Sequence, residues 1–178
     1  MQIKSLFVLA SLAISCLADT SFAQVQDDIL NDMASAVMGL GSAVNRVSPF
    51  FGTRSQVKAV HYSASALNGV IANTTSDING IASQFSDDEA RQLFYTLQDL
   101  KTTFFQSLIG IATRKLAIEL IPDVSALIKE DIETMKQRCV DFMDAFIRHA
   151  PPSVLDEAQA MKASVITLFS SLLLLETV

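Results

Sequence analysis

The feature that most constrains the fold is an unbroken three-and-four spacing of apolar or near-apolar residues across positions 57–85. This set is Val57, Val60, Ala64, Leu67, Ile71, Thr74, Ile78, Ile81 and Phe85. The spacing predicts one helix with a narrow buried seam, roughly 43 Å long at ~1.5 Å per residue. Half of its other positions are Ser, Asn, Thr or Gly, which favour helix weakly. Neighbouring helices must therefore hold this one in place.

The same spacing marks four further segments, at residues 26–47, 86–114, 123–149 and 153–176. Short links separate them, and no period-two run persists as a strand would require. We therefore expect an all-α antiparallel bundle of about five helices. The expected buried positions are Leu30, Met33, Val37, Leu40, Val44, Val47, Ala90, Leu93, Leu97, Leu100, Phe104, Leu108, Ile128, Ile132, Met135, Cys139, Phe142, Phe146, Ala158, Met161, Val165, Leu168, Leu172 and Leu175.

Local signals place the links between these segments. Pro49 and Gly52 break the first helix from the second. Ser86 and Glu89 form a capping box that starts the third. Residues 115–122 have apolar positions that one helix face would not collect, so we expect a link there that Pro122 ends.

The N-terminus has the features of a signal peptide. Lys4 precedes an apolar core at residues 6–18, and Ser21, Phe22 and Ala23 form a small-x-small cleavage pattern. The core is short for a membrane span. We predict a cleaved signal peptide at residues 1–23, one domain at 24–178 and an extracellular protein without a transmembrane anchor, either released or associated with a cell wall.

Composition narrows the partners further. The net charge of −6 argues against binding to nucleic acid. Cys139 is the only cysteine left once Cys16 is removed with the signal peptide, so no internal disulfide is expected. Asn73, Thr74 and Thr75 form an N-glycosylation sequon, which predicts a glycan at Asn73 on the outer face of its helix.

Groups suited to catalysis are scarce. The two histidines, His61 and His149, have no ligand partner at helical spacing, and no catalytic or metal-binding motif is present. Cys139 lies in an inward stripe, where cysteine usually acts as a small apolar residue, so we expect it to be buried and unreactive. The sequence predicts a non-enzymatic protein with no cofactor and no metal.

An excess of apolar residues is the most informative property of the composition. Half of the chain is hydrophobic, and residues 165–175 present a wider apolar face than one core stripe requires. Four interpretations stay open: this helix is central, its end packs on the link at residues 115–122, the bundle encloses an apolar cavity, or it exposes an apolar patch.

Four stretches carry a resemblance to a known family: residues 43–52, 86–90, 108–115 and 146–151. On these stretches the chain resembles the fungal hydrophobic surface-binding protein A family, which includes cell wall galactomannoproteins. The resemblance implies a helical bundle that holds fatty acids, adsorbs to hydrophobic surfaces and recruits lytic enzymes such as secreted hydrolases. No Ser/Thr-rich tail is present, which favours release over wall attachment.

Two functional hypotheses follow. The first is a secreted non-enzymatic protein that binds lipids, such as fatty acids, or hydrophobic surfaces. The alternative is a structural cell wall mannoprotein or an effector that acts through a protein partner. For the first, we expect an apolar site between the helices with the headgroup near Arg114 and Lys115, or near Arg148 and His149. The expected lining residues are Phe104, Leu108, Phe142, Phe146 and Phe169.

Overall fold

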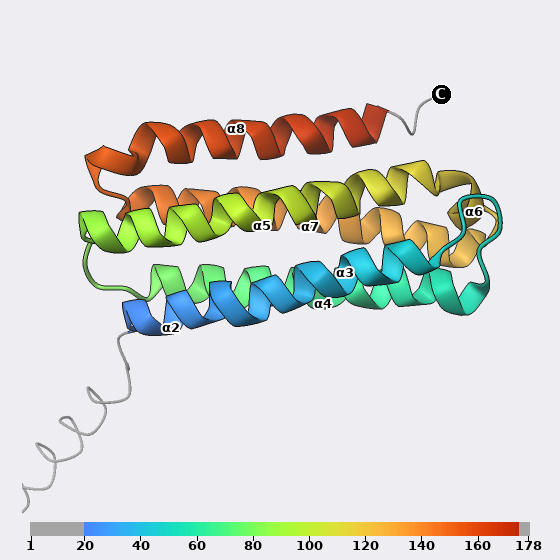
Figure 1. Cartoon of the computed structure of the whole chain (residues 1–178), viewed down its shortest axis with the longest axis horizontal. Helices are drawn as coiled ribbons and strands as arrows, with labels where there is room; N and C mark the ends of the chain where they lie inside the picture. Colours follow the sequence, from blue (N-terminus) through green and yellow to red (C-terminus); the bar gives the residue numbers. More distant parts are fainter. Residues whose placement is uncertain (1–19, 175–178) are drawn as a thin grey trace, which may run out of the picture.

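The computed structural model describes residues 20–174 as a bundle of long helices joined by short links (Figure 1). Among these residues there is no strand, and the all-α prediction is confirmed. The predicted signal peptide falls largely outside the described residues, as does Leu175. The elements are α2 (Phe22–Asp27), the π-helical η1 (Asp28–Met33), α3 (Ala34–Arg46), α4 (Arg54–Asn79), α5 (Asp87–Thr113), α6 (Lys115–Glu119), α7 (Pro122–His149) and α8 (Pro152–Leu174).

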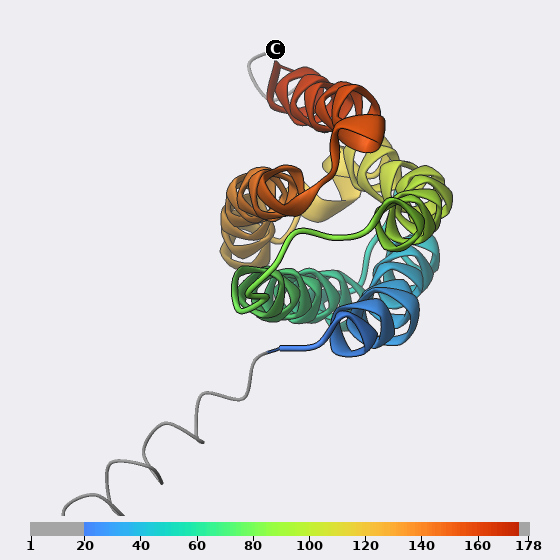
Figure 2. The ribbon, with the colours of Figure 1, turned by 90° about the vertical axis from the view of Figure 1, so that its left-hand side faces the viewer.

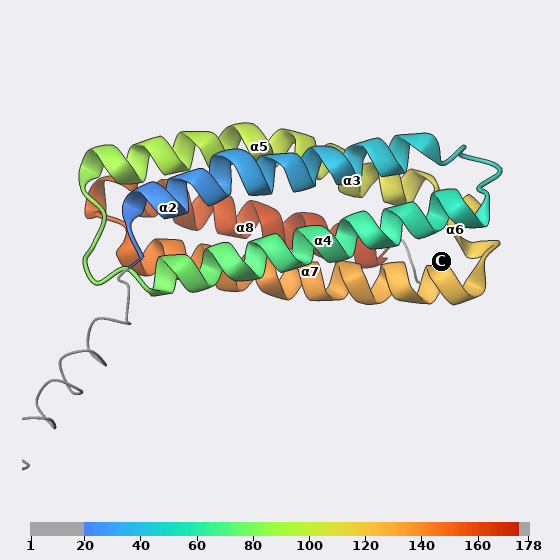
Figure 3. The same ribbon diagram turned by 90° about the horizontal axis from the view of Figure 1, so that it is seen from below.

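The long helices lie in three layers. The first helix, which is α2, η1 and α3 in succession, packs beside α4, while α5 and α7 form the middle layer and α8 covers them both (Figures 1 and 2). Seen from below, the first helix and α4 cover the bundle, with α8 on its far side (Figure 3). Successive long helices run antiparallel, so all of them direct one apolar face towards a common core.

The first helix contains a π-helical turn that changes its register. Its buried residues Val25, Ile29, Met33 and Val37 follow one another at intervals of four. A regular α-helix would rotate such a series off one face, and the wider i→i+5 turn of η1 prevents this. The expectation that Leu30 is buried is wrong, because this turn directs Ile29 inward and leaves Leu30 46% exposed.

Helix α4 ends earlier than its apolar spacing predicts. The seam is buried from Val57 to Ile78, but the helix stops at Asn79. Phe85 is buried in the following loop, where its ring centroid lies 5.8 Å from that of Phe146 and 6.1 Å from that of Phe22. The predicted helix over residues 57–85 is therefore wrong beyond residue 79, because a loop residue happens to continue the helical spacing.

The other boundaries are close to those expected. The capping box of Ser86 and Glu89 starts α5, and α7 begins at Pro122. Residues 115–122, expected to lack a regular helix, contain the short helix α6. Leu100, Cys139, Leu168 and Leu172 were expected to be buried, but they are only partly so. None of the helices in the described part of the chain has the length and apolar character needed to span a membrane.

Candidate functional site: an apolar cavity between the helices

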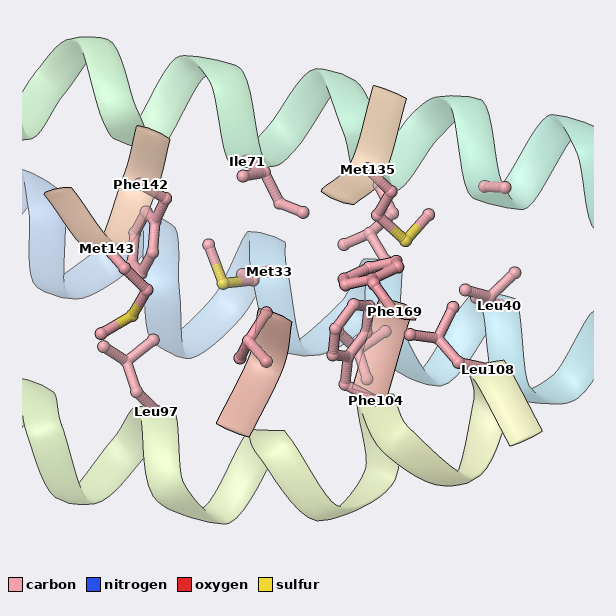
Figure 4. Packing of buried hydrophobic residues seen from close by; sticks show 14 of the residues in the cluster. Met33, Leu40, Ile71, Leu97, Phe104, Leu108, Met135, Phe142, Met143 and Phe169 are labelled. Carbon is pink, nitrogen blue, oxygen red and sulfur yellow. The ribbon is translucent and has the colours of Figure 1, made fainter. Parts of the chain in front are cut away.

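A cavity of about 70 Å³ lies inside the bundle, and all five long helices contribute to its wall. Figure 4 shows several of these side chains, among them Met33, Leu97, Phe104, Phe142 and Met143, pointing into the space between the helices. Twelve of the lining residues are apolar and one is charged. The lining comprises Met33, Val37, Leu67, Ile71, Leu97, Leu100, Lys101, Phe104, Cys139, Phe142, Met143, Met161 and Val165.

Only two of the predicted aromatic residues reach this cavity. Phe104 and Phe142 line it, whereas Phe146 and Phe169 are completely buried and fill the core beside it. The Phe169 ring centroid lies 6.1 Å from that of Phe104 (Figure 4). The Phe104 ring in the cavity wall is thus supported by the fully buried Phe169 ring.

Cys139 also lines the cavity instead of being fully enclosed in the core. It is partly exposed, so the expectation of complete burial is wrong. Burial of the sulfur nevertheless raises the pKa of the Cys139 thiol to about 12. A thiol with such a pKa is almost wholly protonated at neutral pH and is a poor nucleophile.

Lys101 is the one charged residue in the cavity wall, and the sequence predictions missed it. It also lines a shallow, open hollow between α5 and α8, together with Gln98, Glu157 and Met161. Its ammonium lies 6.0 Å from the centroid of the Phe105 ring. Within the described residues no carboxylate forms an ion pair with it. The available signal was its position, four residues after Leu97 and three before Phe104 on the buried face of α5.

The sequence profile of the family described as hydrophobic surface binding protein A matches residues 22–148, which include the first helix, α4, α5, α6 and nearly all of α7. The chain belongs to the hydrophobic surface binding protein A family.

Three solved structures share the fold of this family member. AFMP4P in complex with palmitic acid is 18% identical, with a TM-score of 0.79, over 87% of this chain and 99% of that one. Ligand binding domain 1 of the Penicillium marneffei MP1 protein, complexed with arachidonic acids, is 12% identical, with a TM-score of 0.76 over 87% and 98%. Domain 2 of MP1, complexed with multiple arachidonic acids, is 10% identical, with a TM-score of 0.75 over 86% and 94%. No curated protein sequence matches the chain.

A second hollow, of about 160 Å³, lies near the C-terminal end of α5. Leu108, predicted for the main site, lines this hollow instead, with Ile111, Ile128 and Leu172 among its apolar neighbours. Lys115 lies at its wall, with its Nζ 3.8 Å from Glu119 Oε1.

The other predicted headgroup residues do not meet at one mouth. Arg114 Nε donates to the Val47 carbonyl oxygen at 2.7 Å, and its Nη1 donates to the Gly110 carbonyl oxygen at 3.2 Å. This arginine therefore ties the end of α3 to the end of α5. Arg148 and His149 lie at the opposite end of the bundle, because α7 runs antiparallel to α5 (Figure 1).

His61, one of the two histidines of the sequence, contributes to a polar link between two helices of this family member. His61 Nδ1 lies 2.7 Å from Asp131 Oδ2, and Asn68 Nδ2 donates to the Asp131 carbonyl oxygen at 3.0 Å. These contacts connect α4 to α7, and burial raises the pKa of the Asp131 carboxyl. Among the described residues, no cluster of His, Cys, Asp or Glu could hold a metal ion. Asn73, the predicted glycosylation site, is exposed on α4.

Proposed function

We propose that this chain is a secreted, non-enzymatic protein that binds a fatty acid in the apolar cavity between its five long helices. The observation that carries the proposal is the cavity wall, in which twelve apolar side chains from five helices surround a space edged by one lysine. Ligand pockets commonly combine an apolar wall with a few placed polar groups. The bound arachidonic and palmitic acids of the structural neighbours lend support.

Burial of the acyl chain would supply most of the affinity. Each methylene transferred from water contributes about 0.8 kcal/mol, so a chain of about sixteen carbons gains on the order of 10 kcal/mol before ordering costs. This free energy is large enough for micromolar or tighter binding even if no charged side chain binds the carboxylate.

The cavity must widen to take a long chain. A volume of about 70 Å³ is well below the ~300–1,000 Å³ of typical ligand pockets. Met33, Met143 and Met161 in its wall can change rotamer at low cost. Helix α8 contacts mainly α5 and α7, so we expect it to move outward when a ligand enters.

The headgroup is expected at Lys101. This ammonium is placed where the apolar cavity adjoins the open hollow between α5 and α8, so a carboxylate there would keep partial contact with water. Lys115, which was predicted to hold the headgroup, lines the second hollow and not this cavity. Arg114 is a weaker candidate, because its guanidinium already donates to two carbonyl oxygens.

A cavity-filling variant on α8 tests the proposal. Val165→Phe places a larger side chain in the cavity wall and should lower palmitate affinity at least about tenfold in a fluorescent fatty acid displacement assay. Ile166→Phe is the matched control, because Ile166 is the next residue of α8 and does not line the cavity. Equal palmitate affinity for a folded Val165→Phe variant and the parent would show that the ligand site lies elsewhere.

Lys101→Met tests the headgroup assignment separately. We expect a loss of about threefold to tenfold for palmitate, within the range of one partly exposed ion pair, and no loss for the uncharged hexadecanol. Lys58→Met on α4 serves as the control, since Lys58 has intermediate exposure and lines none of the three hollows. An equal loss for both ligands would assign Lys101 a role in shape and not in charge recognition.

A further inference from the structure

The most exposed large apolar side chains among the described residues gather at one end of the bundle. Phe50 and Phe51, in the link between α3 and α4, are 72% and 79% exposed. Leu116 in α6 and Leu120 at its C-cap are 71% and 67% exposed. We call these four residues the α6 patch.

The two halves of the α6 patch lie side by side. The link after α3 and the short α6 occupy the same end of the bundle in two views (Figures 1 and 3). They also lie close together, since a Cβ atom added at Gly52 would lie 3.3 Å from the Ala117 carbonyl oxygen. Within α6, Ala117 and Ile118 are the buried residues that face the bundle. Leu116 and Leu120 are four residues apart, which places both on the outward face.

Two ion pairs lie near the α6 patch, and the Arg114 guanidinium at this end donates to two backbone carbonyl oxygens. Arg54 forms an ion pair with Asp123, and Lys115 lies 3.8 Å from Glu119. Arg46 in the last turn of α3 offsets the negative end of that helix. The whole chain carries a net charge of −6, which disfavours contact with a strongly anionic surface, so an uncharged surface suits the exposed apolar side chains of this end better.

The size of the α6 patch distinguishes a surface contact from a protein interface. Four side chains of this kind expose on the order of 500 Å² together. That area is large enough to mark a functional patch, yet it falls short of the ~800 Å² per partner of a stable protein interface. A water–hydrocarbon interface has no such minimum, because every apolar atom that enters it leaves water.

We propose that the α6 patch inserts into an extended, uncharged hydrocarbon surface and seats the bundle on it end-on. None of the four residues lines the central cavity, so this adsorption is separate from fatty acid binding. The patch gives the hydrophobic surface binding of the family a location in this chain.

The test compares adsorption to octadecyl-coated silica beads with palmitate binding in the same full-length preparations. Phe50→Ser/Phe51→Ser should lower the bead partition coefficient more than about tenfold, while palmitate affinity and thermal midpoint stay within error. Leu116→Gln/Leu120→Gln should act in the same direction, which guards against an effect of the loop alone. Met38→Ser/Tyr62→Ser is the matched control, because these exposed side chains lie away from the patch, on α3 and α4, and line none of the three hollows.

Four outcomes would overturn the proposal. The first is unchanged adsorption of both patch variants, and the second is an equal loss in the Met38→Ser/Tyr62→Ser control, which would indicate non-specific adsorption. The third is a concentration-dependent dimer that the patch variants abolish, which would assign the patch to self-association. Adsorption that requires anionic phospholipid vesicles and disappears in high salt would also contradict an uncharged target.

Discussion

Asp28 is the residue whose burial has the clearest energetic cost. Its Oδ1 accepts a hydrogen bond from Gln24 Nε2 at 2.7 Å, while its Oδ2 is buried and has no donor among the described residues. Desolvation by burial raises the pKa of this carboxyl, and the neighbouring Asp77 raises it further. Relative to the unfolded chain, the folded state therefore shifts the equilibrium of Asp28 towards the protonated carboxyl.

Asp28→Asn should stabilise the protein at neutral pH. The pKa of Asp28 in the folded state is raised above 3.8, so the native protein binds the carboxyl proton more tightly than the unfolded chain does. The contribution of Asp28 to the free energy of unfolding therefore falls as pH rises from about 3.8 through the raised pKa. The amide removes this penalty, and we expect a gain of about 1–2 kcal/mol at pH 7 and little change at pH 3. Urea denaturation at both pH values measures it, with the exposed Asp32→Asn as control. Destabilisation by Asn at pH 7 would refute this account.

Cys139 offers a chemical probe of the cavity. With a thiol pKa of about 12 instead of 9.0, its thiolate fraction at neutral pH is about a thousandfold below that of a free thiol. We expect native labelling by a thiol reagent to be at least about a hundredfold slower than in denaturant, and slower again with palmitate bound. Mass mapping of the labelled peptide separates Cys139 from Cys16. Labelling that palmitate leaves unchanged would place the acyl chain outside the cavity that Cys139 lines.

At the scale of single elements, the π-helical turn η1 decides which side chain of the first helix enters the core. Ile29 is fully buried and Leu30 is nearly half exposed, although both fit an apolar stripe. The turn also contains Asp28, so the change of register and the buried carboxylate arise from the same turn.

A matched pair of truncations measures this register. Ile29→Ala should lower the free energy of unfolding by about 2–4 kcal/mol, because it leaves a cavity in the core. Leu30→Ala should cost about 0.5 kcal/mol or less, as is usual at exposed positions. Chemical denaturation of both variants gives the comparison, and the reverse order would mean that the first helix continues as a regular α-helix.

Helices α4 and α5 begin in the same way, with a capping box at Thr53 and Gln56 and another at Ser86 and Glu89. In the second box, the Ser86 backbone N–H donates to Glu89 Oε2 at 2.8 Å. This hydrogen bond makes the largest contribution to lowering the pKa of the Glu89 carboxyl, and the hydrogen bond from the Ser86 hydroxyl makes the next largest. The stabilisation is therefore present at neutral pH and is lost as pH falls from about 4.5 through the lowered pKa.

Ser86→Ala should destabilise the protein by about 1 kcal/mol at pH 7, the usual cost of losing an N-cap side chain. The loss should be smaller at pH values below the lowered pKa of Glu89, where its carboxylate is protonated. Ser83→Ala in the preceding loop is the control, since it removes a similar exposed hydroxyl outside the box. Thermal unfolding, monitored by circular dichroism, measures both variants. An equal loss of stability in Ser86→Ala and Ser83→Ala would contradict this account.

For the whole molecule, the proposed ligand should be linked to stability. A ligand that binds only the folded state at one hundred times its Kd stabilises by about 2.7 kcal/mol, which corresponds to about 5–10 °C in Tm for a domain of this size. We expect this shift with palmitate in the parent and in Ile166→Phe, and a much smaller one in Val165→Phe. Scanning calorimetry with and without palmitate measures it, and an equal shift in all three proteins would remove the link to the cavity.

The candidate site could be predicted only in part. Phe104 and Phe142 were expected at the site and do line the cavity, whereas Phe146 and Phe169, at similar stripe positions, fill the core. Lys101 escaped notice because a lysine beside an apolar stripe usually reaches solvent. The headgroup candidates at the ends of α5 and α7 proved to be at opposite ends of the bundle, which the antiparallel arrangement requires (Figure 1).

By itself, the sequence determined the all-α class, the five long helices and most of their ends, because apolar spacing, capping residues and prolines act within a few residues of one another. Local rules failed where distant contacts compete with them, as at Phe85, which continues the spacing of α4 but is buried from a loop. The tertiary structure alone decided where the interior is filled and where it is hollow. Periodicity shows which face turns inward, but an empty volume depends on the summed side chains of five helices packed together.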